Sequence, residues 1–286
     1  MHGENKLKRI AAIHDLSGIG KCSLTAAIPV ISAAGIECNP VPTAVLSSHT
    51  GEMEGYTFLD LTDNMQGYCR HWKSLGITPD AIYTGYLGSL SQIEVVKNII
   101  DDLSSSETAV VVDPAMADSG IMYKGFTADF ASAMKDLCRK ADYILPNITE
   151  ACFLTGAEYK TEYDKQYIES IISELSSLVK KGVILTGVSF SPDKIGCAVF
   201  DKSNSSVSYY FTEKYGGVYY GTGDLFASAF TAGITKEFSL NESAETALEF
   251  VHKSIRETYL AKTDTRLGVA FENHLNYIYE KYGRKL

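Results

Sequence analysis

Short, almost wholly apolar runs alternate along the chain with segments whose apolar residues recur at helical spacing. Five such runs are predicted strands, at residues 9–14, 81–84, 109–112, 143–145 and 183–186. Strands that are apolar along their whole length are typical of a parallel sheet buried on both faces. The alternation with helices therefore predicts an α/β fold, a three-layer sandwich with a mostly parallel central sheet and helices on both faces.

The remaining segments complete this prediction. Apolar stripes indicate the helices, and alternating residues indicate one more strand and a hairpin. Helices are expected at 21–34, 60–75, 90–103, 125–140, 168–179, 244–255 and 268–281, strands at 37–45, 195–201 and 205–213, and a loop at 15–20. Because the chain contains no internal repeat and no linker, we expect a single domain over residues 1–286.

Polar and glycine residues follow the predicted strands where each strand ends. They are Asp15, Gly85 with Tyr86, Asp113, Asn147 with Glu150, and Thr186 with Gly187. The carboxyl ends of parallel strands meet at one edge of a sheet, and ligands of such folds bind there. Loop chemistry alone accounts for each of these residues singly, but their recurrence on one edge favours a ligand site.

Charge and cysteine content narrow the range of partners. With 26 Lys and Arg against 35 Asp and Glu, the net charge of −9 disfavours binding to nucleic acid or to an anionic membrane. The six cysteines form no C-x-x-C pair, so we expect reduced thiols rather than a zinc site or a redox motif. No apolar stretch approaches the ~20 residues of a membrane helix, and no secretory signal is evident. We therefore expect a cytoplasmic protein.

The sequence Gly221-Thr222-Gly223-Asp224 stands at the start of a predicted buried helix. Glycines let the backbone approach a ligand closely, and the first N–H groups of a helix attract an anion. A carboxylate in that first turn is suited to take a proton from a hydroxyl group that attacks a phosphoryl group. The alternative is that Asp224 only caps the helix.

Asn147 and Glu150 allow two interpretations. Their spacing at the start of a helix matches a capping box. Their oxygens, beside Asp113 at the sheet edge, would also suit a hydrated Mg²⁺ bound to ATP phosphates. The two interpretations are compatible, because both residues can serve both purposes.

Other motifs are weaker or absent. His49, in the polar loop after the strand at 37–45, is either a ligand-facing group or a loop histidine whose partners lie within the protein. The fragment Gly20-Lys21-Cys22 is no P-loop, because Asp15 stands where the motif needs glycine and Cys22 where it needs Ser or Thr. No Gly-x-Gly-x-x-Gly follows the first strand, which disfavours an NAD-dependent oxidoreductase.

Together, these motifs resemble the ribokinase superfamily, and within it the pyridoxal (vitamin B6) kinase group. Gly221-Thr222-Gly223-Asp224 and Asn147-x-x-Glu150 resemble the superfamily's anion-hole and magnesium-phosphate motifs. The likeness to the pyridoxal kinases rests on three further segments, Ser47 to Gly51, Thr84 to Gly88, and Val112-Asp113-Pro114 followed by Asp118 and Tyr123. The resemblance extends over nearly the full chain in the same order.

The resemblance implies transfer of the γ-phosphoryl group of ATP to the 5′-hydroxyl of pyridoxal, pyridoxine or pyridoxamine. The residues that it implies are Asp224 as general base; the N–H groups of Gly221, Thr222, Gly223 and Asp224 as anion hole; Asp113, Asn147 and Glu150 around Mg-ATP, with Asp113 and Glu150 meeting the metal directly or through water; Thr186, Gly187 and Tyr220 beside the nucleotide; and Asp15, Ser17, His49, Thr50 and Tyr86 around the pyridine ring. It also implies a homodimer, and it leaves open a monovalent cation as a second cofactor.

The first loop departs from the family pattern, in which a serine commonly stands at the position of Asp15. An acid there would favour a protonated ring nitrogen or an amine-bearing vitamer. Two other functions stay open: a hydroxymethylpyrimidine kinase of thiamine synthesis, which shares the Gly-Thr-Gly-Asp motif, and a non-catalytic vitamer-binding protein on the same scaffold. The first loop of the former usually reads Gly-Ser-Asp, unlike His14-Asp15-Leu16, and the latter is disfavoured because Asp224 is present.

Overall fold

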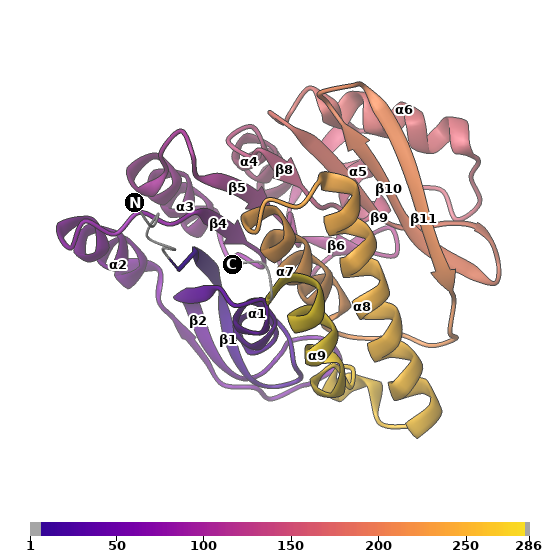
Figure 1. Cartoon of the computed structure of the whole chain (residues 1–286), viewed down its shortest axis with the longest axis horizontal. Helices are drawn as coiled ribbons and strands as arrows, with labels where there is room; N and C mark the ends of the chain where they lie inside the picture. Colours follow the sequence, from indigo (N-terminus) through magenta and orange to yellow (C-terminus); the bar gives the residue numbers. More distant parts are fainter. Residues whose placement is uncertain (1–6, 284–286) are drawn as a thin grey trace, which may run out of the picture.

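The structure is a computed structural model, and it describes residues 7–283. Its centre is a nine-stranded sheet of order β11-β10-β9-β8-β5-β4-β1-β2-β3 (Figure 1). The strands are β1 (Arg9–Ile19), β2 (Glu37–Ser48), β3 (Phe58–Asp60), β4 (Ala81–Thr84), β5 (Ala109–Val112), β8 (Tyr143–Ile144), β9 (Gly182–Ser191), β10 (Lys194–Asp201) and β11 (Ser206–Glu213). The six strands from β9 to β2 in this order pair in parallel, and β3, β10 and β11 join antiparallel. The short strands β6 (Ala117–Asp118) and β7 (Ile121–Met122) form a separate hairpin.

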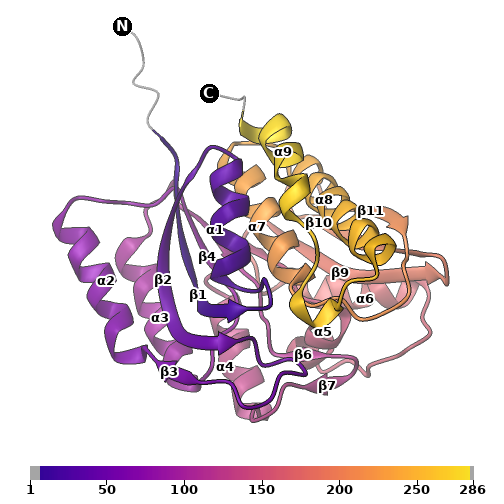
Figure 2. The same ribbon diagram turned by 90° about the horizontal axis from the view of Figure 1, so that it is seen from below.

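Helices cover both faces of this sheet (Figure 2). The helices are α1 (Leu24–Ala33), α2 (Thr62–Ser74), α3 (Leu90–Leu103), α4 (Ala128–Cys138), α5 (Ile148–Thr155), α6 (Lys165–Ser176), α7 (Thr222–Thr235), α8 (Leu240–Ala261) and α9 (Leu275–Ile278). One core cluster joins α2 to α6 with the sheet, and a second joins α1, α7, α8 and α9 with the opposite face. Alternate β1 residues enter the two clusters, Ala11 and Ile13 the first, Ile10 and Ala12 the second. The predicted α/β fold is confirmed.

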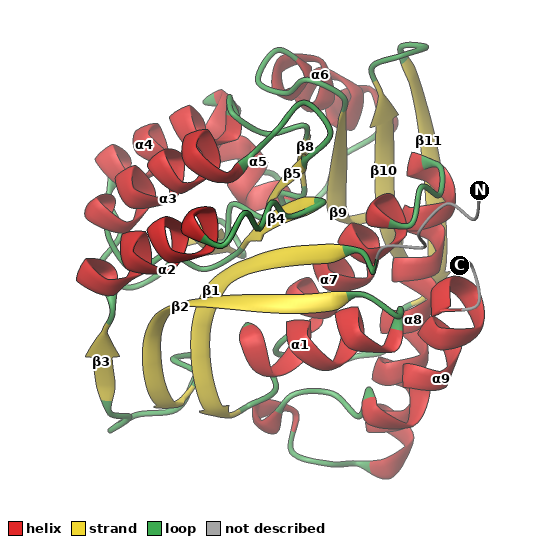
Figure 3. Cartoon of the chain, turned by 60° about the vertical axis from the view of Figure 1, so that its left-hand side comes forward, coloured by secondary structure: helices red, strands yellow, loops and turns green. Residues whose placement is uncertain are grey.

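The first two strands are longer than predicted. Residues 15–19 are not a loop, because β1 continues through an irregularity in the pairing between His14 and Leu16 and pairs with β2 as far as Ser48. Figure 3 shows both strands as long curved arrows that extend past β4. The bulge re-aims the side chains that follow it, which is why Leu16 and Ile19 are exposed and why no simple alternation marked the strand. As a result, Asp15 and Ser17 lie on a strand, and α1 begins at Leu24 rather than near Lys21.

Two further predictions about element ends were wrong. The strand at 183–186 does not stop at Gly187, because β9 continues to Ser191 as one arm of an antiparallel pair with β10. The helix expected at 268–281 begins later than predicted, because residues 272–283 are helical in three consecutive segments, η2 (Glu272–His274), α9 and η3 (Tyr279–Gly283), and η1 (Thr265–Leu267) precedes them. Gly268, at φ 84° and ψ −176°, is not helical and separates η1 from the rest.

The remaining secondary-structure predictions differ from the structure only at element ends. The boundaries of a single domain over residues 1–286 stay a prediction. No helix within residues 7–283 combines the length and the apolar character needed to cross a membrane.

Candidate active site

The start of α7 leaves its first N–H groups available. Gly221 stands at the N-cap in the left-handed conformation, with φ 76°, and no side chain caps the helix. A Cβ atom on Gly221 would lie 2.4 Å from the carbonyl oxygen of Lys21, so the close approach of these two backbones requires glycine. An uncapped helix start carries partial positive charge and unpaired donors, which suits an anion such as a phosphoryl group.

Asp224 lies in the first turn of α7, and it does not cap the helix. Its Oδ2 accepts a 2.9 Å hydrogen bond from the backbone N–H of Ser23, on the segment before α1. The capping alternative is therefore wrong for the described structure. The side chain is 17% exposed, and burial raises the pKa of Asp224 to about 7. A carboxyl group with that pKa can accept a proton near neutral pH and is still within reach of a ligand.

Ser23 holds two of the acidic side chains together. Its hydroxyl donates a 2.6 Å hydrogen bond to Oδ1 of Asp15, while its N–H serves Asp224. The residue has φ 53° and ψ −128°, a backbone conformation that a side chain disfavours. Such strain at a buried residue is characteristic of functional sites. Sequence reasoning missed Ser23, because Gly20-Lys21-Cys22 was tested only as a P-loop.

Asp15 and Ser17 are brought together on β1. The Ser17 hydroxyl donates a 2.7 Å hydrogen bond to Oδ2 of Asp15, and both side chains are buried. Burial raises the pKa of the Asp15 carboxyl, and the two hydroxyl donors partly offset that effect. The protein itself thus supplies a partner for each Asp15 oxygen, from Ser17 and Ser23.

A second acidic group lies beside Asp224. Burial, followed by the negative charges of Glu150 and Asp224, raises the pKa of Asp113 well above its usual range. Glu150 is 3% exposed, and burial raises the pKa of its carboxyl as well. Buried carboxyl groups whose pKa values are raised by burial and by neighbouring carboxylates are typical of a site that receives positive charge with its ligand.

The predicted capping box at the start of α5 is confirmed. Asn147 Oδ1 accepts from the N–H of Glu150 at 2.9 Å, and Glu150 Oε2 accepts from the N–H of Asn147 at 2.8 Å. The other carboxylate oxygen, Oε1, accepts from the N–H of Met116 at 3.1 Å. Both Glu150 oxygens therefore have backbone donors, so the fixed carboxylate would meet a metal ion through water more readily than directly.

A hydrated Mg²⁺ carried by ATP fits these residues. Within residues 7–283 no three His, Cys, Asp or Glu side chains converge as a metal cage. Mg²⁺ bound to nucleotide phosphates needs only one or two carboxylates, since it keeps several waters. Asp113, buried beside Glu150 with a raised pKa, supplies an acidic group of that kind.

Thr186 and Gly187 lie beside the capping box. Asn147 and Thr186 pair as a parallel bridge, and the Thr186 N–H donates to the carbonyl of Pro146 at 2.9 Å. Gly187 has φ 75°, and a Cβ atom there would meet nothing within 4 Å. The segment after β8 and the middle of β9 therefore lie side by side, and the space next to Gly187 is open.

The loop after β2 packs against Tyr220. The ring of His49 stacks on the ring of Tyr220 with centroids 5.0 Å apart. Nδ1 of His49 accepts from the N–H of Gly51 at 3.0 Å, so Nε2 carries the proton and donates to the Arg266 carbonyl at 2.6 Å. His49 is thus the loop histidine with internal partners. Thr50, next to it, is exposed.

Tyr86 offers an aromatic ring close enough to Asp15 to respond to its charge. It is half-buried and stacks on Phe126 with centroids 5.7 Å apart and an interplanar angle of 27°. Burial, with the charge of Asp15 as a smaller cause, raises the pKa of Tyr86 to about 12. The phenol therefore stays neutral and can serve as a stacking and hydrogen-bonding surface.

Comparison with known proteins assigns the chain to a family. The phosphomethylpyrimidine kinase family matches residues 20–267. The chain belongs to the phosphomethylpyrimidine kinase family. Among solved structures of similar proteins, a pyridoxal kinase from Lactobacillus plantarum is 32% identical, with a TM-score of 0.88 over 96% of this chain and 97% of that chain.

Two further relatives of this kinase family are informative. A candidate phosphomethylpyrimidine kinase from Bacteroides thetaiotaomicron VPI-5482, solved with pyridoxal, is 37% identical with a TM-score of 0.91 and covers 96% of each chain. A pyridoxal kinase of Dictyostelium discoideum is 28% identical over 85% of this chain and 82% of its own length. The resemblance to pyridoxal kinases that the motifs indicated is confirmed, and the protein is a kinase.

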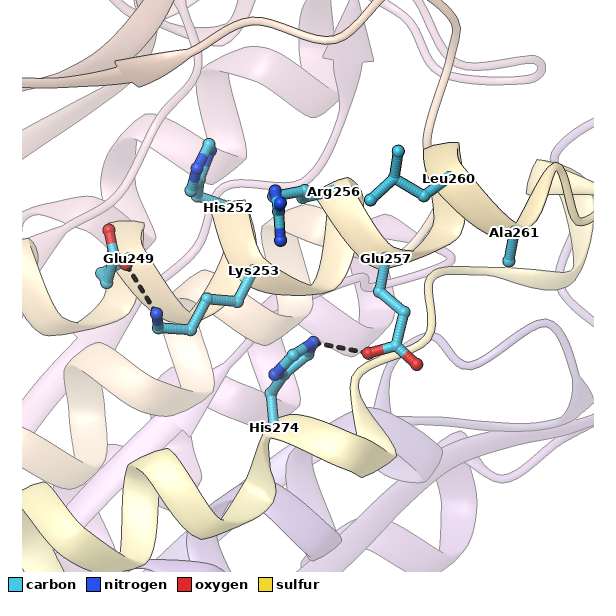
Figure 4. Close-up of a pocket in the computed structure, with 8 residues that line it drawn as sticks. All are labelled: Glu249, His252, Lys253, Arg256, Glu257, Leu260, Ala261 and His274. Carbon is cyan, nitrogen blue, oxygen red and sulfur yellow. Dashed lines mark ion pairs between the residues drawn. The ribbon is translucent and has the colours of Figure 1, made fainter.

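A separate pocket lies away from this site, along α8 and η2 (Figure 4). Its volume is about 690 Å³, and none of the predicted site residues lines it. Two of its basic residues lie beside acidic ones, Lys253 next to Glu249 at 2.9 Å and Nε2 of His274 next to Glu257 at 2.7 Å. The pairs offset much of the charge that could attract an anionic ligand.

Proposed function

We propose that this kinase transfers the γ-phosphoryl group of ATP to the 5′-hydroxyl of pyridoxal, pyridoxine or pyridoxamine. The observation that carries the proposal is the mostly buried carboxylate of Asp224, in the first turn of a helix that no side chain caps. The pyridoxal kinases among its relatives, and the pyridoxal-bound structure that is 37% identical, support the choice of acceptor.

Asp224 acts as general base in this proposal. Its carboxylate takes the proton of the acceptor hydroxyl as the alcohol oxygen bonds to the γ-phosphorus, and the bond between that phosphorus and the β,γ-bridging oxygen breaks to release ADP. The N–H groups of Gly221, Thr222, Gly223 and Asp224 stabilise the charge on the transferring group. Transfer therefore depends on the uncapped start of α7.

Asp113, Asn147 and Glu150 would hold Mg-ATP from the ends of β5 and β8. Mg²⁺, when bound, neutralises phosphate charge and aligns the β- and γ-phosphates. The raised pKa of Asp113 supports this role, because a cation would relieve the repulsion among these carboxyl groups.

Nucleotide and vitamer occupy opposite sides of Asp224 in the proposed arrangement. Thr186, Gly187 and Tyr220 border the nucleotide, and the open space at Gly187 supports that assignment. Asp15, Ser17, Thr50 and Tyr86 surround the pyridine ring, and His49, whose ring nitrogens bond within the protein, holds the loop that carries Thr50. Both carboxylate oxygens of Asp15 accept hydrogen bonds from the hydroxyls of Ser17 and Ser23. In this proposal Asp15 therefore acts on the pyridine ring through its negative charge and by holding these two hydroxyls in place.

A second candidate acceptor is hydroxymethylpyrimidine. A hydroxymethylpyrimidine/phosphomethylpyrimidine kinase of Bacillus subtilis is 30% identical over 64% of this chain and 65% of its own length. The shorter match, next to pyridoxal kinases that cover more of the chain, favours the B6 vitamers. The base at position 224 argues against a non-catalytic vitamer-binding protein.

The test measures release of ADP with each B6 vitamer and with hydroxymethylpyrimidine. Each assay is run with and without Mg²⁺, and with either K⁺ or Na⁺ to test for a monovalent cation. We expect turnover with at least one vitamer that depends on Mg²⁺ and falls by at least about a hundredfold in Asp224→Asn. The matched control is Asp129→Asn, an exposed aspartate in the first turn of α4. Turnover with hydroxymethylpyrimidine alone would overturn the acceptor, and an active Asp224→Asn variant would overturn the mechanism.

We also propose that the protein is a cytoplasmic homodimer. Six cysteines without disulfide bonds fit a reducing compartment. Exposed apolar side chains on the edge strand β3 and its neighbour β2 support self-association, with Val45, Phe58 and Leu59 exposed by 39%, 48% and 61%. Sedimentation of the wild type and of Leu59→Lys tests the dimer.

A further inference from the structure

His14 is a fully buried histidine without a hydrogen bond. Its side chain is 0% exposed, and within the described residues neither Nδ1 nor Nε2 has a hydrogen-bond partner. Buried polar groups are usually paired, because an unpaired one costs folding free energy. The ring therefore needs an explanation other than packing.

The ring of His14 lies in a narrow slot between Tyr83, on β4, and Gly85, which follows β4. It contacts the ring of Tyr83 edge-on, with centroids 4.3 Å apart. A Cβ atom on Gly85 would lie 2.2 Å from Cε1 of His14, so the slot exists only because residue 85 has no side chain. Enclosed in this way, the ring cannot rotate to another partner.

The slot directs one nitrogen at the proposed base. Nδ1 of His14 is 3.9 Å from Oδ1 of Asp224, the carboxylate oxygen that the N–H of Ser23 does not contact. Burial lowers the pKa of His14 to about 3, so the ring is neutral and has one N–H. The ring packs against Tyr83, and its Nδ1 lies nearest the carboxylate of Asp224. A carboxylate oxygen accepts hydrogen bonds, so a bond between the two requires the proton of the neutral ring on Nδ1.

We infer that His14 is a positioning residue for Asp224, whose Oδ1 receives a hydrogen bond from His14 Nδ1 when both substrates are bound. The inference rests on the proposed function of Asp224 as base. The carboxylate is 17% exposed and His14 is not, so Asp224 is the partner that moves the remaining ångström or so. Oδ1 held by His14 and Oδ2 held by Ser23 leave further lone pairs for the alcohol proton.

This arrangement gives Asp224 one orientation during transfer. Asp224 alone accepts the proton, and His14 neither gains nor loses one. A base held by two donors spends no time in rotamers that face away from the alcohol, and a misplacement of about 1 Å can cost a hundredfold in rate.

A matched pair of variants tests the inference. His14→Asn keeps an N–H donor near the position of Nδ1, and His14→Leu has the same shape without the donor. We expect kcat of His14→Leu to be about tenfold to a hundredfold below that of His14→Asn. KM for ATP and for the vitamer should differ by less than about threefold between the two, since neither substrate contacts the ring. Equal kcat values would overturn the inference.

Spectroscopy of the wild type gives an independent test that needs no folded variant. ¹⁵N chemical shifts of the histidine rings, with ADP, Mg²⁺ and a vitamer bound, distinguish the two neutral tautomers. We expect His14 to be neutral and protonated on Nδ1, the less common tautomer in solution. Protonation on Nε2, or a charged ring, would contradict the proposed hydrogen bond.

Asp224→Asn separates the failure of this inference from failure of the proposed function. If Asp224→Asn abolishes turnover while the two His14 variants are equal, only the role of His14 is wrong. If Asp224→Asn is active, the base assignment is wrong, and the role of His14 fails with it. In the Asp224→Asn background, replacement of His14 by Leu should lower the residual rate by less than about threefold.

Discussion

The backbone N–H of Ser23 donates a 2.9 Å hydrogen bond to Oδ2 of Asp224, a residue 201 positions later in the chain. The contact joins the segment between β1 and α1 to the first turn of α7. It requires the strained conformation of Ser23, at φ 53° and ψ −128°.

Ser23→Gly should therefore be more stable than Ser23→Ala. Both variants lose the hydroxyl that bonds to Asp15, and both keep the N–H that bonds to Asp224. Glycine adopts the conformation of residue 23 without strain. This relief of strain should exceed the entropic cost of glycine, so the free energy of unfolding of Ser23→Gly should be higher by about 1 kcal/mol. Denaturant unfolding of the two proteins measures the difference, and a more stable alanine variant would show that the strain is absent.

Gly221→Ala should fold and lose activity. A Cβ atom at this position would lie 2.4 Å from the Lys21 carbonyl oxygen, and the residue has φ 76°. The helix start must shift away from the segment before α1, which displaces the N–H groups and Asp224 together. We expect kcat to fall by about a hundredfold. Gly67→Ala, in α2 with nothing within 4 Å of its Cβ, is the control and should keep wild-type turnover.

The pH dependence of turnover should report Asp224. Because its pKa is raised to about 7, the carboxylate is the minor form below that pH. Only the carboxylate can accept the alcohol proton, so kcat/KM, which reports the titration of groups in the free enzyme, should fall about tenfold per pH unit below pH ~7 and level off above it. A profile that is flat from pH 5 to pH 8 would contradict the assignment of this base. The Asp129→Asn control should follow the wild-type profile.

Asp113→Asn should raise stability while it lowers activity. The pKa of Asp113 is raised in the folded protein, so between its unfolded and folded pKa values the folded state binds more protons. The free energy of unfolding therefore falls as pH rises through that window. Removing the charge should raise the melting temperature more at pH 8 than at pH 5, because the folded wild type carries this charge to a greater extent at the higher pH. A gain that is equal at both pH values would contradict the charge repulsion.

Much of the fold could be predicted because the central strands are apolar along their length. β4 and β5 match their predicted bounds, and the residues after the parallel strands collect at one edge as expected. Asp15 to Ile19 could not be recognised as strand, because the bulge after His14 removes the alternation that marks exposed strands. The helix expected at 268–281 starts only at Glu272, because Gly268 has non-helical dihedral angles.

The parts of the site that escaped prediction are contacts between distant segments. The Gly-x-Gly spacing was enough to find Asp224, since the chemistry of the motif is local. Ser23 and His14 act on Asp224 across about two hundred residues, and no local pattern marks such a contact. A histidine inside an otherwise apolar strand is the one local signal for His14, and its place at the end of the predicted strand hides it.

The hydrogen bond between His49 and the carbonyl of Arg266 has a consequence for biosynthesis. It ties the loop after β2 to the segment that follows α8. On the ribosome, the nascent chain makes β1, β2 and their loops early, yet His49 lacks its partner until residue 266 has emerged. The loop after β2 is therefore fastened only late in translation, although Asp15, Ser17 and Tyr86 are made early.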